Sequence, residues 1–301
     1  MSEVNVEQKV ASHAPFHKDL ILGYVLLGLQ PVFVRVLSIQ RLTPMQTVWL
    51  RFVLVAVCIL IWSIVERRWM ATAQPIWFSV RGVLGAVAVY LYFCSVASVG
   101  AARATLLNYT YPFWANLFAV MLGARPPGRF WLGLLLAFVG IAVVVLPLDA
   151  LHSLTLAQGD VFGLLSAVVA GAAVLVVKQL RKTDDAVSIV GAFTVGGLLI
   201  SSWSHRPLDT LQVAFEPAFA WAALGVGLSS FLGHVYFTRG YRDASVQEAT
   251  LLSLIVPLVA AVMGILILGE PLGGRFIAGA GLVFFALVFV ARGPKLAVET
   301  R

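Results

Sequence analysis

The sequence predicts an all-α membrane protein whose ten transmembrane helices form two inverted five-helix repeats. Three observations lead to this fold class: the composition, the number of apolar runs, and motifs of the first half that recur in the second. Of the 301 residues, 60% are hydrophobic and 12% are charged, whereas a soluble domain carries about 25% charged residues. We therefore expect the lipid bilayer to be the solvent for most of the protein surface.

Ten apolar runs come near the length of about 20 residues that a transmembrane helix needs. Pro44, Pro75 and Pro217 stand at the starts of three runs, in the first helical turn, where a backbone amide has no helical partner to lose. The predicted spans are residues 19–38, 44–65, 75–98, 100–122, 128–146, 160–180, 186–203, 217–238, 244–268 and 273–291.

The fourth and ninth runs contain copies of one motif. Residues 104–112 and 249–257 both begin with Ala-Thr-Leu-Leu and end in proline, at an offset of 145 residues (249 − 104). A Leu-Gly pair and an Arg-Phe-x-x-Gly motif recur further along at an offset of 146, so that Leu122 matches Leu268 and Arg129 matches Arg275. Collinear matches at nearly one offset indicate two homologous halves, and such internal repeats are typical of transporters.

Five spans per half is an odd number, so the second half is predicted to cross the membrane in the opposite sense to the first. Such an inverted repeat has a pseudo-two-fold axis in the membrane plane and can open one central site to either side in turn. With a cytoplasmic N-terminus, 14 Lys and Arg residues lie on the cytoplasmic side and 5 on the other, so both termini are predicted to be cytoplasmic. The predicted units are an N-terminal tail (1–18), a first repeat (19–147), a connecting loop (148–159), a second repeat (160–291) and a C-terminal tail (292–301).

The charge pattern argues against a nucleic-acid partner. The net charge of +7 follows from positive residues that gather in cytoplasmic loops. Cys58 and Cys94 lie inside apolar runs and form no disulfide or metal-binding pattern. No G-x-x-x-x-G-K-S/T loop is present, so ATP is not expected to drive the protein directly. We expect no cofactor and no metal. A small solute and the bilayer are the expected partners, and the oligomeric state is left open.

Paired glycines and prolines relate the chain to a known family. The second half carries Pro257, the turn Leu268-Gly269-Glu270, and Gly279 and Gly281, while the first half carries Pro112, Gly133 and Gly140. In the first and sixth spans a glycine precedes a basic residue by seven positions, as Gly28 precedes Arg35 and Gly171 precedes Lys178. With these motifs, the chain resembles the EamA-type members of the drug/metabolite transporter superfamily. The turn Gly123-Ala124-Arg125 departs from the family, which often has an acidic residue there.

The resemblance implies a small-solute carrier with a central cavity between its halves. Members are usually exporters of amino acids or related metabolites, which implies a bacterial-type inner (plasma) membrane. The resemblance specifies neither the solute nor the direction of transport.

Five residues share one face of the fourth span at three- and four-residue steps: Thr105, Asn108, Tyr109, Pro112 and Asn116. Pro112 removes a backbone hydrogen bond and frees a carbonyl near Asn108, which a cavity or a solute can satisfy. Pro112 is therefore a predicted hinge, and Thr105 and Asn108 are predicted to bind solute. The alternative is that these polar groups hold the helices of the bundle together.

The ninth and first spans contain further candidates. Thr250 and Ser253 share a face with Pro257, which predicts two solute-binding residues and a second hinge, with the same packing alternative. In the first span, Gln30 stands beside Pro31. We predict that Gln30 lines the cavity and that Pro31 is a third hinge.

Aromatic and charged residues inside spans complete the set of solute-binding candidates. Tyr90, Tyr92 and Tyr111 lie well inside their spans, where they either stack on an apolar or aromatic solute or pack against lipid. Arg35 lies about one turn from the outer end of its span, where it either holds a substrate carboxylate or extends to the headgroups. His234, deep in the eighth span, either titrates near neutrality or serves as a neutral hydrogen-bonding residue.

Glu248 is the candidate for proton coupling, because it is the only acidic residue more than one turn inside a span. The residues from Ser245 to Glu248 also spell a capping box, in which the carboxylate satisfies free amides at a helix start. Arg103 occupies the equivalent position in the first repeat (103 + 145 = 248). The scarcity of buried carboxylates favours facilitated diffusion or exchange over strong proton coupling.

Three functions compete at this level. A secondary transporter that exports a small polar metabolite by alternating access is favoured by the repeat. An intramembrane serine-histidine hydrolase would need Ser229 and His234 to face each other, but they are five residues apart on one helix. A non-transporting receptor or scaffold is disfavoured because the short loops leave little surface for a soluble partner.

Overall fold

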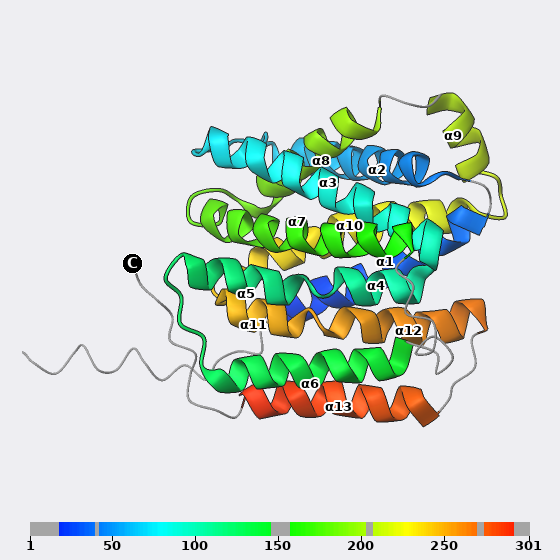
Figure 1. Cartoon of the computed structure of the whole chain (residues 1–301). Helices are drawn as coiled ribbons and strands as arrows, with labels where there is room; N and C mark the ends of the chain where they lie inside the picture. Colours follow the sequence, from blue (N-terminus) through cyan, green and yellow to red (C-terminus); the bar gives the residue numbers. More distant parts are fainter. Residues whose placement is uncertain (1–17, 40–41, 146–156, 203–206, 270–273, 292–301) are drawn as a thin grey trace, which may run out of the picture.

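The structure, a computed structural model, describes residues 18–39, 42–145, 157–202, 207–269 and 274–291 (Figure 1). These residues form helices and connecting turns, with no strand among them. The helices are α1 (Lys18–Ile39), α2 (Pro44–Glu66), α3 (Pro75–Val99), α4 (Ala101–Asn108), α5 (Tyr111–Met121), α6 (Gly128–Val145), α7 (Gln158–Leu180), α8 (Ala186–Ser201), α9 (Pro207–Ala214), α10 (Ala220–Gly240), α11 (Val246–Leu252), α12 (Ile255–Leu268) and α13 (Gly274–Ala291).

The all-α membrane fold class is confirmed. Within the part of the chain that the structure describes, six stretches are long and apolar enough to cross a membrane: α1, α2, α3, α7, α10 and residues Val246–Ile267, which join α11 to α12. Three shorter apolar helices accompany them, at Gly128–Val143, Ala186–Ser201 and Ile277–Val290. The number of ten spans and their arrangement as an inverted repeat stay predictions.

The fourth and ninth predicted spans are each broken into two helices. α4 ends at Asn108 and α5 begins at Tyr111, while α11 ends at Leu252 and α12 begins at Ile255. Pro112 and Pro257 stand in the first turn of the second helix of each pair, where their lack of an amide proton interrupts the helical ladder. The linking residues keep near-helical backbone angles, so each pair continues in roughly one direction (Figure 1).

The region before the eighth span differs from the prediction. Pro217 was expected in the first turn of that span, but it lies in a turn, and α10 begins three residues later at Ala220. The Glu216 carbonyl accepts hydrogen bonds from the amides of Phe219 (2.8 Å) and Ala220 (3.0 Å), which starts the helix after the proline. The short helix α9 was not predicted, because its eight residues are too few and too mixed in polarity to form an apolar run.

Helices of the two halves pack against each other in an exchanged pattern. α3 packs on α7, and α1 packs on α10. In the predicted repeat α7 is the counterpart of α1, and α10 is the counterpart of α3, so the two contacts interchange when the predicted halves are swapped. α6 and α13, the last helix of each half, pack on each other. In Figure 1 the chain runs from α4 to α5 in the opposite direction to its course from α11 to α12.

Glycines bring some of these helices into close contact. A Cβ atom at Gly196 of α8 would lie 2.3 Å from the carbonyl oxygen of Gly82 in α3. A Cβ at Gly140 of α6 would lie 2.7 Å from the carbonyl oxygen of Gly279 in α13. Small residues at such contacts are typical of helix packing in lipid, because van der Waals contact rather than hydrophobic burial drives association there.

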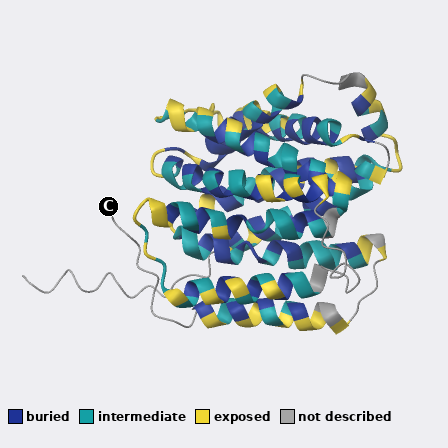
Figure 2. Ribbon diagram, viewed as in Figure 1, coloured by how far each residue is buried: buried dark blue, intermediate teal, exposed yellow. Residues whose placement is uncertain are grey.

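Buried and exposed residues lie on different faces of the helices. Buried residues lie between the helices, and exposed ones form stripes on their outer faces (Figure 2). Many of the exposed side chains are large and apolar, among them Ile64, Leu135, Leu199 and Phe284. Apolar outer faces are suited to contact with lipid tails.

Candidate functional site

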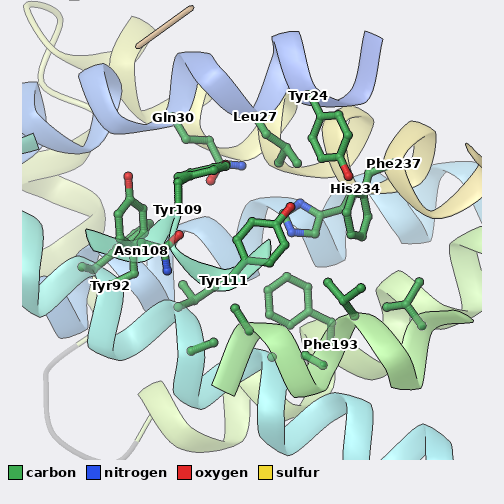
Figure 3. Close-up of a pocket in the computed structure, with 18 of the residues that line it drawn as sticks. Tyr24, Leu27, Gln30, Tyr92, Asn108, Tyr109, Tyr111, Phe193, His234 and Phe237 are labelled. Atoms are coloured by element: carbon green, nitrogen blue, oxygen red, sulfur yellow. The ribbon is translucent and has the colours of Figure 1, made fainter. Parts of the chain in front are cut away.

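A cavity of about 140 Å³ lies between the halves and receives side chains from eight helices. Its lining residues are Tyr24, Leu27, Gln30 and Pro31 (α1), Arg51 (α2), Arg81, Gly85, Ala88, Val89, Tyr92 and Phe93 (α3), Asn108 (α4), Tyr109 (between α4 and α5), Tyr111 (α5), Ala170, Ala173, Val174 and Val177 (α7), Phe193 (α8), and His234 and Phe237 (α10). Figure 3 shows the labelled aromatic rings, Gln30 and Asn108 converging between the ribbons. A cavity of about 150 Å³ can hold a benzene molecule, so this one has room for a small solute.

A hydrogen-bond network joins the two halves at one side of the cavity. The hydroxyl of Ser230 accepts from Gln30 Nε2 and from Arg51 Nε, both at 2.8 Å. His234 Nδ1 lies 3.0 Å from the carbonyl of Ser230, and His234 Nε2 lies 3.5 Å from Arg51 Nη2. A neutral ring that carries its proton on Nδ1 fits both neighbours, because Nδ1 then donates to the carbonyl and Nε2 accepts from the guanidinium. The network therefore supports the neutral hydrogen-bonding role for His234.

Two arginines contribute positive charge to the cavity wall. The side chains of Arg51 and Arg81 are 1% and 5% exposed. Their guanidinium carbons lie 5.0 and 4.4 Å from the ring centroid of Phe193, which places both groups against one aromatic side chain. Arg51 also lies 4.9 Å from the ring centroid of Phe52. No Asp or Glu is among the described residues that line the cavity.

Tyrosines and Asn108 cover the side of the cavity formed by the broken helices. Asn108 Nδ2 donates to Ser166 Oγ of α7 at 2.7 Å. The rings of Tyr109 and Tyr111 meet edge to face, with centroids 5.6 Å apart. The hydroxyl of Tyr24 donates to the carbonyl of Ala249 in α11 at 2.7 Å. These bonds hold the walls of the cavity to elements of both halves.

Among the predicted solute-binding residues, Gln30, Asn108, Tyr111 and His234 line the cavity, as does the predicted hinge Pro31. The structure thus brings these residues together in space. Their contact with a solute stays a prediction.

Three further candidates lie behind the wall. Thr105 is buried, and its Oγ1 lies 2.8 Å from the hydroxyl of Tyr92. Thr250 Oγ1 accepts from Asn116 Nδ2 at 2.9 Å, and Ser253 Oγ donates to the carbonyl of Thr250 at 2.6 Å. In this conformation these hydroxyls bond to protein groups, which is the packing alternative recognised from the sequence.

Arg35 and Tyr90 lie away from the cavity. Both side chains are half-buried, and neither is among the lining residues. Their predicted role in solute binding therefore has no geometric support in this conformation. The hinge candidates Pro112 and Pro257 stand at the two helix breaks described above.

The equivalent residues Glu248 and Arg103 both act at helix starts. Glu248 Oε2 accepts from the amide of Ser245 at 2.9 Å, and Ser245 Oγ accepts from the amide of Glu248 at 3.1 Å, which forms the capping box of α11. Arg103 pairs with both carboxylate oxygens of Asp160, at 2.7 Å each. Asp160 also accepts from the amide of Ala157 at the start of α7. Both positions thus stabilise a helix N-terminus.

Arg51, Arg81 and Phe193 are among the lining residues that were not predicted from the sequence. Both arginines lie inside predicted spans, residues 44–65 and 75–98, and charges inside spans usually mark functional sites. That signal was available without a structure. Their shared contact with Phe193 was not, because Phe193 lies on α8, more than 100 positions further along the chain. Among the described residues, no group of three or more His, Cys, Asp or Glu is arranged to hold a metal ion.

The fold and the cavity together define a helical multi-pass membrane protein with a solute-sized cavity between its two halves. The chain belongs to the EamA-like transporter family, whose model matches residues 20–146 and again residues 157–292. This confirms the resemblance to the EamA-type members of the drug/metabolite transporter superfamily. The two matches each cover one half of the chain.

Individual relatives agree with the family. The chain is 31% identical over 223 residues to the pseudopaline exporter CntI of Pseudomonas aeruginosa (strain UCBPP-PA14), covering 72% of this chain and 75% of that protein. It is 26% identical to an uncharacterized transporter of Archaeoglobus fulgidus, over 70% of this chain and 74% of the relative. A crystal structure matches with a TM-score of 0.69 and 16% identity over 91% of this chain and 98% of that chain, which shows the fold alone.

Proposed function

We propose that this protein is a secondary transporter of a bacterial-type inner membrane that exports amino acids or related small polar metabolites by alternating access. The observation that carries the proposal is the cavity, whose polar groups come from both halves of the chain, with Gln30, Arg51 and Asn108 in the first and His234 in the second. A site shared between two repeats is the arrangement that alternating access requires. The name of the Pseudomonas relative supports export as the direction.

The exchanged helix contacts support an inverted pair of repeats. The α3–α7 and α1–α10 contacts interchange when the halves are swapped. The broken pairs α4–α5 and α11–α12 run in opposite directions in Figure 1. We infer ten spans, with both termini cytoplasmic as the distribution of Lys and Arg predicts.

The broken helices supply a means of movement. Asn116 Nδ2 donates to Thr250 Oγ1 at 2.9 Å and so links α5 to α11. Pro112 and Pro257 leave each pair without a continuous ladder of hydrogen bonds, so α5 and α12 can tilt relative to α4 and α11. Because ligand pockets commonly have volumes of about 300–1,000 Å³, we expect the cavity of about 140 Å³ to widen when it opens.

The polar groups of the cavity wall bear on whether transport is coupled to protons. Glu248 caps α11, and no carboxylate is among the described residues that line the cavity, so this part of the wall holds no acidic group that could carry a proton with the solute. We therefore favour facilitated diffusion or solute exchange over proton coupling.

Solute flux through reconstituted protein tests the proposal. The purified full-length chain is placed in proteoliposomes loaded with labelled amino acids and organic acids, and efflux is compared with that from protein-free liposomes. A transporter releases at least one solute faster than the protein-free control, with saturation and with stimulation by the same unlabelled solute outside. An enzyme or a scaffold moves none of them.

A further inference from the structure

We propose that the cavity selects solutes through a carboxylate group, which binds to the guanidinium groups of Arg51 and Arg81. This inference rests on the proposed transport function and specifies its substrate class. The solute is an organic carboxylate with an apolar or aromatic body, and amino acids with such side chains are included.

The first argument is the absence of a counter-ion. Arg51 lies seven residues into α2 and Arg81 six residues into α3, or about 9–11 Å along the helices. Neither guanidinium has an ion pair with any residue that the structure describes. By contrast, Arg103 forms a bidentate ion pair with Asp160. Buried charges are costly without a partner. Two of them on one wall favour an anionic ligand.

The second argument concerns their hydrogen-bond donors. Nη1 of Arg51 and Nε of Arg81 are buried and have no acceptor. Arg51 Nε donates a hydrogen bond to Ser230 Oγ at 2.8 Å, whereas Arg81 makes no hydrogen bond to another described residue. A guanidinium presents its donors in a planar fork that matches the two oxygens of a carboxylate.

The third argument is that the aromatic contacts do not replace such a ligand. Phe193 lies near both guanidinium groups, and Phe52 lies near that of Arg51. Stacking on a ring offsets part of the cost of burying the charge. A ring contact supplies no oxygen acceptor, and Nη1 of Arg51 and Nε of Arg81 still have no hydrogen-bond partner beside these rings.

The absence of a side chain at Gly85 leaves room for the guanidinium of Arg81. A Cβ atom at Gly85 would lie 2.1 Å from Arg81 Nη1 and 2.4 Å from Cδ2 of Phe193. An alanine there must displace the guanidinium or the ring. Because the residue one turn after Arg81 is glycine, the Arg81 guanidinium has room to lie at the cavity wall.

The rest of the wall describes the remainder of the solute. Phe93, Tyr109, Tyr111 and Phe237 present aromatic surface to the cavity. Gln30 and Asn108 each donate their amide nitrogen to a serine hydroxyl, which leaves their carbonyl oxygens able to accept from a solute. An amino group is therefore tolerated through these oxygens and the aromatic faces, but the carboxylate is the required group.

Three probes of one shape separate these requirements. They are 3-phenylpropionate, which carries the carboxylate alone, L-phenylalanine, which adds an amino group, and L-phenylalaninamide, in which a neutral amide replaces the carboxylate. Binding is measured on the detergent-purified full-length protein as a concentration-dependent rise in Tm. We expect both carboxylates to bind at least about tenfold more tightly than the amide, because charge-assisted bonds to the guanidinium groups are lost in the amide. Equal binding of the amide, or no binding of any probe up to millimolar concentration, overturns the proposal.

Variants assign the effect to the arginines. Arg81→Gln is expected to weaken carboxylate binding by about tenfold or more, and Arg81→Lys, which keeps a point charge without the fork, is expected to lie between it and the unmodified protein. Gly85→Ala provides a second route that leaves both arginines in place and should also weaken binding. Arg68→Gln, in the exposed turn after α2, is the matched control and should bind as the unmodified protein does. Unchanged carboxylate binding in well-folded Arg81→Gln contradicts the assignment.

Flux measurements distinguish this inference from the function on which it rests. If proteoliposomes transport the amide or another cationic or neutral solute while carboxylates neither move nor compete, transport stands and carboxylate selection fails. If carboxylates bind but no solute moves, the transport proposal fails and the binding site stands.

Discussion

Asn116 donates its amide to the hydroxyl of Thr250 at 2.9 Å, and so joins α5 of one broken helix pair to α11 of the other. Both side chains are fully buried. Asn116 Nδ2 also donates to the carbonyl of Pro112 at 2.7 Å. One side chain therefore connects a helix break in the first half to a helix in the second half.

This contact predicts a measurable coupling between two distant positions. Asn116→Ala and Thr250→Val should each lower stability, and the double variant should lose less than the two single losses combined. Hydrogen bonds between helices in membrane proteins are worth about 0.6 kcal/mol on average and about 1.7 at most, so we expect a coupling energy in that range. Unfolding in mixed detergent micelles measures it. Thr194→Ala, which removes a hydroxyl bonded within its own helix, is the control and should show no coupling with Asn116→Ala.

The capping role of Glu248 predicts that its charge is not needed for transport. Glu248→Gln keeps an oxygen that can accept from the Ser245 amide, so transport and its pH profile should be unchanged. Ser245→Ala removes the N-cap hydroxyl and should lower stability by about 1 kcal/mol. Flux across a pH gradient in proteoliposomes gives the comparison. Loss of pH dependence in folded Glu248→Gln protein would replace the capping role with proton coupling.

Asn108 is predicted to contact the solute. Asn108→Ala removes one cavity-facing amide and its bond to Ser166, and we expect a rise in KM of about fivefold, equivalent to about 1 kcal/mol. Ser201→Ala removes a buried hydroxyl that bonds within α8 and lies outside the cavity lining. It should leave KM unchanged. Equal transport kinetics in Asn108→Ala protein would remove Asn108 from the binding site.

The turn between α7 and α8 predicts a pH dependence of stability. Burial alone would raise the pKa of Asp184, but hydrogen bonds from Thr72, Ala73 and Thr183, together with nearby Arg181, outweigh it and hold the pKa below its ordinary value. A carboxyl group whose pKa is depressed on folding stabilises the protein above its unfolded-state pKa, and this contribution is lost as pH falls through the folded-state pKa. Asp184→Asn should therefore lower Tm at neutral pH and flatten the loss of Tm below about pH 4. An unchanged Tm profile in this variant would show that the carboxylate contributes nothing.

The helices could be predicted from the sequence because they depend on local features. Apolar runs, the proline at position 44 and the proline at position 75 locate α2 and α3 to within a residue. The breaks after Asn108 and Leu252 follow from the prolines that come a few residues later. α9 could not be predicted, because a short helix of mixed polarity leaves no periodic signal.

The site was predicted only in part, for a physical reason. Gln30, Asn108 and Tyr111 were found because polar or aromatic groups inside a span stand out from their neighbours. Thr105 and Thr250 carried the same signal, but the hydroxyls bond to Tyr92 and Asn116 instead of facing the cavity. Which face of a span borders the cavity depends on tertiary packing, which local sequence patterns do not reveal.

The most direct test of the central claim is solute efflux through protein whose cavity has been filled. Ala173 of α7 lines the cavity, and Ala97 lies exposed on α3. We predict that Ala173→Phe proteoliposomes release solute no faster than protein-free liposomes, while Ala97→Phe matches the unmodified chain at equal reconstituted amounts. Undiminished efflux through Ala173→Phe protein would contradict the claim that solute passes through the cavity between the halves.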